Sequence, residues 1–287
     1  MTCEFVKDYA ANEVLRKSLG ELAKKTFSID IETWYQSGGW DHEYIPYSYK
    51  DGQVIVSSVF ANKMKVSVDQ NEYLFIQIGT IMTEKAYRGK GLSRKIIEQV
   101  IREYKGKADG FYLYANDSVT EFYPKFGFIP GYEYVYYRNI LKSEKDTLIQ
   151  PLKGCSEMQR KEFLHIRENS IHNERISMDN KGILKFWTDS LEEIYYLPEE
   201  ECYVGAEFQE ETMLLKQIFS LHKVDVNRVI DAFHEKAAKV ELGFVPKETA
   251  GFEVKRIVKK HYNYFYIGEV LKQLEQQKVR FPEYSHA

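Results

Sequence analysis

Long apolar runs, cysteines and an excess of basic residues are all missing from this sequence. No apolar run approaches the roughly 20 residues that a membrane-spanning helix needs. The N-terminus carries charged side chains at positions 4, 7 and 8, which does not suit a signal peptide. The three cysteines, Cys3, Cys155 and Cys202, are too few and too scattered for a disulfide framework or a zinc site. We therefore expect a soluble, cytoplasmic protein with no metal and no membrane partner.

Positive charge is not in excess either. The 287 residues include 40 Lys+Arg and 43 Asp+Glu, so the formal net charge is −3. Because nucleic-acid binding depends on massed Lys and Arg, this balance argues against a nucleic-acid partner. Hydrophobic residues make up 44% and aromatic residues 15%, and the length allows one large domain or two ordinary ones.

Hydrophobic spacing in the first half predicts an α/β domain. Apolar positions recur at helical spacing over 8–25, whereas 27–49 is aromatic and loop-like. An Asp-Gly turn at 51–52 separates two strands of a hairpin. Further on, the pattern predicts strands at 54–60, 73–82, 110–115 and 132–140, a helix from 92 to 101, and a short helix at 118–125.

The second half repeats part of this order. Phe126-Gly127-Phe128-Ile129-Pro130 is echoed by Leu242-Gly243-Phe244-Val245-Pro246, and strand-like runs at 212–219 and 262–267 flank a helix-like run at 226–233. A polar segment over 141–154 separates the halves. These features favour a duplicated fold, with domains at 1–145 and 146–287.

The segment around Arg88-Gly89-Lys90-Gly91 has the character of a phosphate-binding loop. It follows a strand, opens a helix, and lies among Lys85, Arg94 and Lys95. Glycines let backbone N–H groups approach an anion, and a helix N-terminus adds partial positive charge. A pyrophosphate fits this pattern. The alternative is a helix start with a solvated basic face.

The next segment decides between these interpretations. Asn116 ends a strand, and Tyr123 stands four residues before Gly127-Phe128. Together with the loop, this order resembles the Gcn5-related N-acetyltransferase (GNAT) superfamily. Its loop reads Gln or Arg, two residues, Gly, one residue, then Gly or Ala, and a Tyr precedes a later Gly-Phe by four. Arg88 and Gly91 match, while Ser93 replaces the last Gly or Ala.

The resemblance implies a GNAT fold, a mixed and mostly antiparallel sheet flanked by helices, followed by a degenerate second copy. It also implies acetyl transfer from acetyl-CoA to an amine without a covalent enzyme intermediate. Tyr123 is the implied general acid for the leaving thiolate, the alternative being a core tyrosine with a satisfied hydroxyl. The implied cofactor-binding residues are Ile81, Met82, Thr83, Arg88, Gly89, Lys90, Gly91, Leu92, Ser93 and Asn116, the last of which could also cap a helix.

The base that deprotonates the amine is not evident. Where histone-acetylating relatives carry a strand carboxylate, this sequence has Phe75. A water or another carboxylate could serve. The aromatic stretch 27–48 has acids and no Lys or Arg, which suits a cationic amine, although its aromatics could instead pack on the core. Its candidates are Asp30, Glu32, Asp41, His42 and Glu43.

The second half lacks both landmarks of the cofactor site. No glycine-rich loop follows the 212–219 run. Lys239, and not a tyrosine, stands four residues before Gly243, the position that corresponds to Tyr123 in the first half. We therefore expect this half to close the acceptor cleft or to form a homodimer. The remaining histidines, including His165 and His172, show no metal spacing. The chain as a whole is predicted to acetylate a small-molecule or protein amine; a non-catalytic acetyl-CoA sensor or scaffold is the alternative.

Overall fold

The computed structural model describes residues 3–69, 71–144 and 146–287. Its helices are α1 (Glu13–Phe27), α2 (Ile31–Gln36), α3 (Leu92–Tyr104), α4 (Glu157–Asn169), α5 (Lys181–Thr188), α6 (Val226–Asp231) and α7 (Glu269–Gln276). Single 3-10 turns are η1 (Lys85–Tyr87), η2 (Asp117–Val119), η3 (Tyr123–Phe126), η4 (Pro198–Glu200) and η5 (Glu283–Ser285). The strands are β1 (Glu4–Lys7), β2 (Tyr44–Asp51), β3 (Val54–Val68), β4 (Asn71–Thr83), β5 (Gly110–Ala115), β6 (Ile129–Pro130), β7 (Tyr134–Asn139), β8 (Gln150–Pro151), β9 (Ile176–Asp179), β10 (Ile194–Leu197), β11 (Cys202–Gln209), β12 (Thr212–Phe219), β13 (Lys239–Leu242), β14 (Glu253–Arg256) and β15 (Asn263–Ile267).

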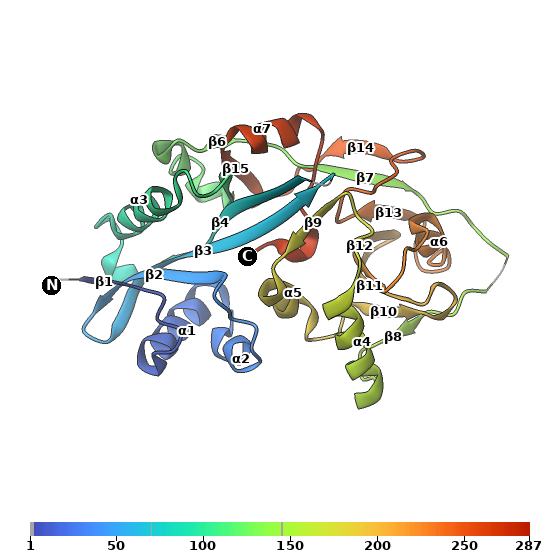
Figure 1. The fold of residues 1–287 in the computed structure, drawn as a ribbon, viewed down its shortest axis with the longest axis horizontal. Helices are drawn as coiled ribbons and strands as arrows, with labels where there is room; N and C mark the ends of the chain where they lie inside the picture. The colour runs from blue at the N-terminus through green and yellow to red at the C-terminus, as the bar shows by residue number, and fades with distance from the viewer. Residues whose placement is uncertain (1–2, 70, 145) are drawn as a thin grey trace.

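The first sheet has the order β1-β2-β3-β4-β5-β15-β6, with β9 pairing the far end of β3. Its strands are antiparallel except for the parallel pair β4·β5. Helix α3 packs on one face, and α1 with α2 covers the other (Figure 1). Asn12 begins α1 by accepting a hydrogen bond from Leu15 N–H, and left-handed Ser28 ends it.

The second sheet has the order β8-β10-β11-β12-β13-β7-β14. Its single parallel pair, β12·β13, occupies the same place in the order as β4·β5, and the neighbouring pairs are antiparallel. Helix α6 follows β12 as α3 follows β4. The two sheets therefore repeat one topology, which confirms the predicted GNAT-like second copy.

The two halves exchange a strand. β7 comes from the first half of the sequence but lies between β13 and β14 in the second sheet. β15 comes from the second half and lies between β5 and β6 in the first sheet. In Figure 1, β7 is coloured with the first half but runs beside β13 and β14. The division into domains at 1–145 and 146–287 stays a prediction, and each sheet contains a strand from the other side of it.

Most predicted elements are present, and two differ. The strands predicted at 110–115 and 212–219 are β5 and β12 with the same bounds. The short helix predicted at 118–125 is instead the two turns η2 and η3. The loop-like stretch 27–49 contains α2, which begins because Asp30 accepts a hydrogen bond from Thr33 N–H.

Candidate active site

Strands β4 and β5 separate partway along their length. Their parallel pairing runs from Phe75↔Gly110 to Gln77↔Tyr112, and no further pairing follows. A cavity of about 430 Å³ lies where they diverge, lined on one side by β4 residues and on the other by Tyr114 and Asn116. Because unpaired strand edges expose N–H and C=O groups, this opening offers backbone partners to an extended ligand.

A bulge in β4 borders the cavity. In the pairing of β4 with β3, Gly79 faces Phe60 and Met82 faces Ser58. Two residues of β4, Thr80 and Ile81, therefore face the single β3 residue Val59. Thr80 has a φ of +47°, which is uncommon for a residue other than glycine. Such bulges interrupt the strand ladder and redirect backbone N–H groups.

The predicted phosphate loop begins where β4 ends. Gly89 and Gly91 have φ of +77° and +74°, and a Cβ at either would meet no atom within 4 Å. Gly91 caps α3 without a side-chain hydrogen bond. Among the described residues, the N–H groups of 89–93 have no hydrogen-bond partner outside the helix. The loop is therefore an open cradle of donors at the positive end of a 13-residue helix.

Two of the basic side chains near the loop have fixed positions. Arg88 Nε donates to the Thr83 carbonyl at 3.0 Å, which ties the loop back to β4. The Lys90 ammonium lies 4.5 Å from the centre of the Tyr87 ring. Arg88, Gly89 and Lys90 are all exposed, so an anion can reach this surface.

Tyr123 opens η3 and lines the same cavity. Its side chain is 5% exposed and packs against Phe128 and Phe265, the second of which lies on the exchanged strand β15. No hydrogen-bond partner for its hydroxyl is found in the described part of the chain. Burial raises the pKa of this hydroxyl to about 12, so it carries its proton at neutral pH.

The other predicted contact residues divide into two groups. Ile81, Ser93 and Asn116 line the cavity, and the Asn116 side chain makes no capping hydrogen bond. The side chains of Met82 and Leu92 are buried, and neither residue lines the cavity. Phe75 is fully buried in the core and does not line the cavity.

The acidic and aromatic stretch between α1 and β2 mostly serves the fold. Asp30 caps α2, Glu32 pairs with Arg16, and Glu43 pairs with Lys65. Trp34 and Trp40 are buried, and the Trp34 indole donates to the Gly182 carbonyl of the second half. The packing alternative is thus the better description of this stretch. Asp41 is the exception, because it lines a second cavity.

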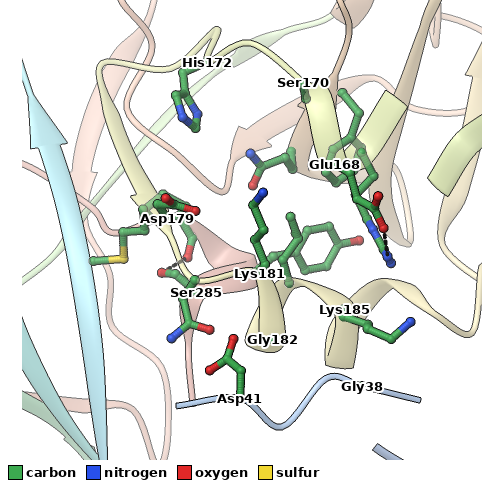
Figure 2. A pocket seen from close by; sticks show the side chains of 18 residues that line it. Gly38, Asp41, Glu168, Ser170, His172, Asp179, Lys181, Gly182, Lys185 and Ser285 are labelled. Atoms are coloured by element: carbon green, nitrogen blue, oxygen red, sulfur yellow. Dashed lines mark hydrogen bonds and ion pairs between the residues drawn. The ribbon is translucent and has the colours of Figure 1, made fainter. Parts of the chain in front are cut away.

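That second cavity, of about 450 Å³, lies between the two halves. Figure 2 shows that Asp41 approaches it from the first half, whereas Glu168, Asp179 and Lys181 come from the second. His172 lies 3.1 Å from the Glu174 carboxylate, which raises the pKa of that histidine. Tyr284 and Ser285 complete the lining.

The segment 281–287 joins the two cavities, which sequence analysis missed. Ser285 lines the cavity between the halves, and Ala287 lines the cavity at the β4 bulge. A Cβ added to Gly79 would lie 2.8 Å from the Ala287 carbonyl oxygen. Tyr114 was also missed, although its place one residue before the predicted strand end was a usable signal.

The described residues contain no group of three or more His, Cys, Asp or Glu that could hold a metal ion. In the same part of the chain, no helix is long and apolar enough to cross a bilayer. The open loop donors, the diverging strands and the buried Tyr123 fit a long ligand with a diphosphate at one end and a reactive group at the other. Fold and site together define an α/β protein with two copies of one sheet topology and an open loop of N–H donors beside a cavity.

Comparisons with known proteins agree with this class. Residues 17–131 match the family model of the acetyltransferase (GNAT) domain. A probable N-acyltransferase from Enterococcus faecalis V583 is 17% identical, with a TM-score of 0.56 over 93% of this chain and 72% of that one. A GCN5-related N-acetyltransferase from Kribbella flavida is 12% identical, with a TM-score of 0.56 over 92% and 71%. One from Anabaena variabilis is 13% identical, with a TM-score of 0.55 over 92% and 72%. No curated protein matches the chain.

The chain therefore carries a GNAT acetyltransferase domain in its first half, and nearly its whole length has the fold of GNAT proteins. The predicted resemblance to the GNAT superfamily is confirmed for residues 17–131. At these identities the solved structures establish the fold alone.

Proposed function

We propose that the protein is an N-acetyltransferase that moves the acetyl group of acetyl-CoA directly to an amine. The observation that carries the proposal is the meeting, at one cavity, of the open loop, the β4 bulge and Tyr123. In this proposal the N–H groups of 89–93 hold the pyrophosphate. The pantetheine arm lies between β4 and β5 along Ile81 and Asn116.

The bulge and Tyr123 carry the chemistry in this proposal. A backbone N–H of the Gly79–Thr83 segment stabilises the oxygen of the thioester as negative charge develops on it. The Tyr123 hydroxyl, which is protonated at neutral pH, gives its proton to the leaving sulfur. The acceptor enters from the cavity between the halves, whose lining includes the acids Asp41, Glu168 and Asp179 as well as basic side chains of the second half.

A non-catalytic acetyl-CoA sensor is the second candidate. It is favoured by Phe75, because a buried phenylalanine stands where some relatives have a strand carboxylate. Both candidates require the loop, so turnover rather than binding separates them.

The test of the loop is calorimetric titration of the purified protein with acetyl-CoA, beside Gly89→Glu. The new carboxylate would face the pyrophosphate, so we expect affinity to fall at least 100-fold. Gly106→Glu is the matched control, since Gly106 has a φ of +75° and open space around it but lies beyond the other end of α3. Equal affinity in Gly89→Glu and the wild type would contradict the assigned loop.

A further inference from the structure

Thr80 is the strained residue of the bulge in β4. Its φ of +47° lies in the left-handed region, and in the described part of the chain no other β-branched residue has a positive φ. This conformation is rare for such a side chain because the Cβ crowds the backbone, so neighbouring contacts must hold it. Thr80 also lines the cavity at the bulge, which places the strain beside the proposed chemistry.

A hydrogen bond links the Thr80 side chain to a strand that is not its neighbour. Thr80 Oγ1 lies 3.1 Å from the hydroxyl of Tyr44, the first residue of β2. Because β3 lies between β2 and β4 in the sheet, the Tyr44 side chain reaches across β3 to the bulge. Desolvation raises the pKa of the Tyr44 hydroxyl to about 12, so this group keeps its proton at neutral pH.

Tyr44 is itself held in place on several sides. Its ring centre lies 4.5 Å from those of Trp34 and Phe60. Its backbone carbonyl accepts a hydrogen bond from the Trp40 indole at 2.8 Å. The Trp34 indole donates in turn to the Gly182 carbonyl of α5 at 2.8 Å. The Tyr44 hydroxyl therefore belongs to a packed aromatic cluster that is anchored to both halves of the molecule.

The conformation of Thr80 decides where two backbone donors point. Each peptide group is planar, so the φ and ψ of Thr80 set the orientation of the peptides that carry the N–H groups of Thr80 and Ile81. Ile81 lines the cavity as well. A return of Thr80 to an extended conformation would rotate these N–H groups, and a hydrogen bond weakens steeply as its donor leaves the line to the acceptor.

We propose, resting on the acetyltransferase function above, that Tyr44 is a positioning residue for acetyl transfer. Its hydroxyl holds Thr80 in the left-handed conformation, which aims a backbone N–H of the bulge at the thioester oxygen. Tyr44 touches no substrate in this scheme and acts through Thr80. The bonds made and broken are those of the transfer itself, and Tyr44 determines how well the developing oxyanion is held.

The first test removes either hydroxyl of the pair in the full chain. Tyr44→Phe keeps the ring packing, and Thr80→Val keeps the β-branched shape. We expect each to lower turnover about 10- to 100-fold while the Kd for acetyl-CoA stays within about twofold. The loss should be alike with spermidine and with hydroxylamine as acceptor, since the oxyanion forms with either. Thr80→Ser, which keeps the hydroxyl, should stay within about threefold of the wild type.

The double variant Tyr44→Phe/Thr80→Val should turn over no more slowly than either single variant, because all three lack the same hydrogen bond. Tyr137→Phe is the matched control, since it removes a hydroxyl that donates to Glu253 at 2.8 Å in the second sheet. It should leave turnover unchanged.

The ¹³Cα and ¹³Cβ chemical shifts of Thr80 report its backbone conformation without any acceptor. In Tyr44→Phe they should move towards the values of an extended residue, while those of Gln77, which precedes the bulge in β4, stay in place. Unmoved Thr80 shifts, full turnover in Tyr44→Phe, a loss confined to one acceptor, or losses that multiply in the double variant would each overturn the role of Tyr44 and leave the acetyltransferase function standing. A wild-type protein that binds acetyl-CoA and acetylates neither acceptor would overturn both proposals.

Discussion

Tyr123 joins two properties that a general acid needs. Its hydroxyl reaches a cavity, and burial keeps it protonated, since the pKa of about 12 lies far above neutral pH. Deprotonation of this group therefore sets in only well above neutral pH, and the proton remains available throughout the physiological range.

Tyr123→Phe keeps the ring packing against Phe128 and Phe265 but removes the proton. We expect turnover to fall 10- to 100-fold while the affinity for acetyl-CoA stays within about twofold. Steady-state CoA release and calorimetry measure the two quantities. Tyr49→Phe on β2, outside the cavity, is the control. Full turnover in Tyr123→Phe would assign the proton to another group.

At the scale of elements, strand β4 matters because it contacts both the loop at 88–93 and the segment 281–287, which we call the tail. Gly79 lies at its bulge, where an added Cβ would come 2.8 Å from the Ala287 carbonyl and 3.1 Å from Asn62 Nδ2. The absence of a side chain at Gly79 therefore lets the tail approach the strand.

Gly79→Ala should push the tail away from β4. We expect the free energy of unfolding to fall by about 1–3 kcal/mol, since overpacking forces neighbouring groups to shift. Turnover should fall with it, because Ala287 lines the cavity at the bulge and moves with the tail. Urea unfolding with an unchanged m-value is the measurement. Gly20→Ala in α1, where a Cβ meets nothing within 4 Å, is the control and should stabilise by about 0.5–1 kcal/mol. Unchanged stability in Gly79→Ala would mean that the tail does not depend on this contact.

Sequence patterns predicted the parts of the site that are local. The loop at 88–93 lies in a stretch where strand, turn and helix periodicities can be read directly, and the resemblance to the GNAT superfamily implied the role of Tyr123. The contact of Gly79 with Ala287 joins opposite ends of the chain, and no local pattern encodes it. The place of Ala287 in the cavity was therefore not predicted.

The exchange of β7 and β15 could not be predicted for a related physical reason. Tyr134–Asn139 and Asn263–Ile267 read as equivalent strands, and the pattern of a strand does not say which sheet it joins. Placement depends on long-range pairing, here Phe265 with Leu113 and Val240 with Arg138. Aromatic content was a partial signal, because the tyrosines of β5 and β15 meet across this pairing.

At the scale of the whole molecule, the tail gives the second sheet a different role from the first. Pairing of β12 with β13 ends at Leu215↔Leu242, where the first sheet has its cavity. Here Arg280 donates to the Leu242 carbonyl, and Tyr284 packs against Gly205. The segment 281–285 of the chain occupies the opening, and its continuation supplies Ala287 to the cavity at the β4 bulge.

Because each sheet contains a strand of the other half, neither should unfold alone. We expect one cooperative transition in calorimetry, with the calorimetric enthalpy equal to the van't Hoff enthalpy. Tyr264→Ala, which removes a buried ring from the exchanged strand β15, should lower the stability of the whole molecule by about 3–5 kcal/mol and shift that single transition downwards. Val14→Ala, exposed on α1, should barely move it. Two separate transitions, with only one shifted by Tyr264→Ala, would show that the sheets are independent despite the exchange. A single transition would mean that the candidate site and the second half fold together, so that a fragment ending at 145 lacks the β15 and Ala287 side of the cavity.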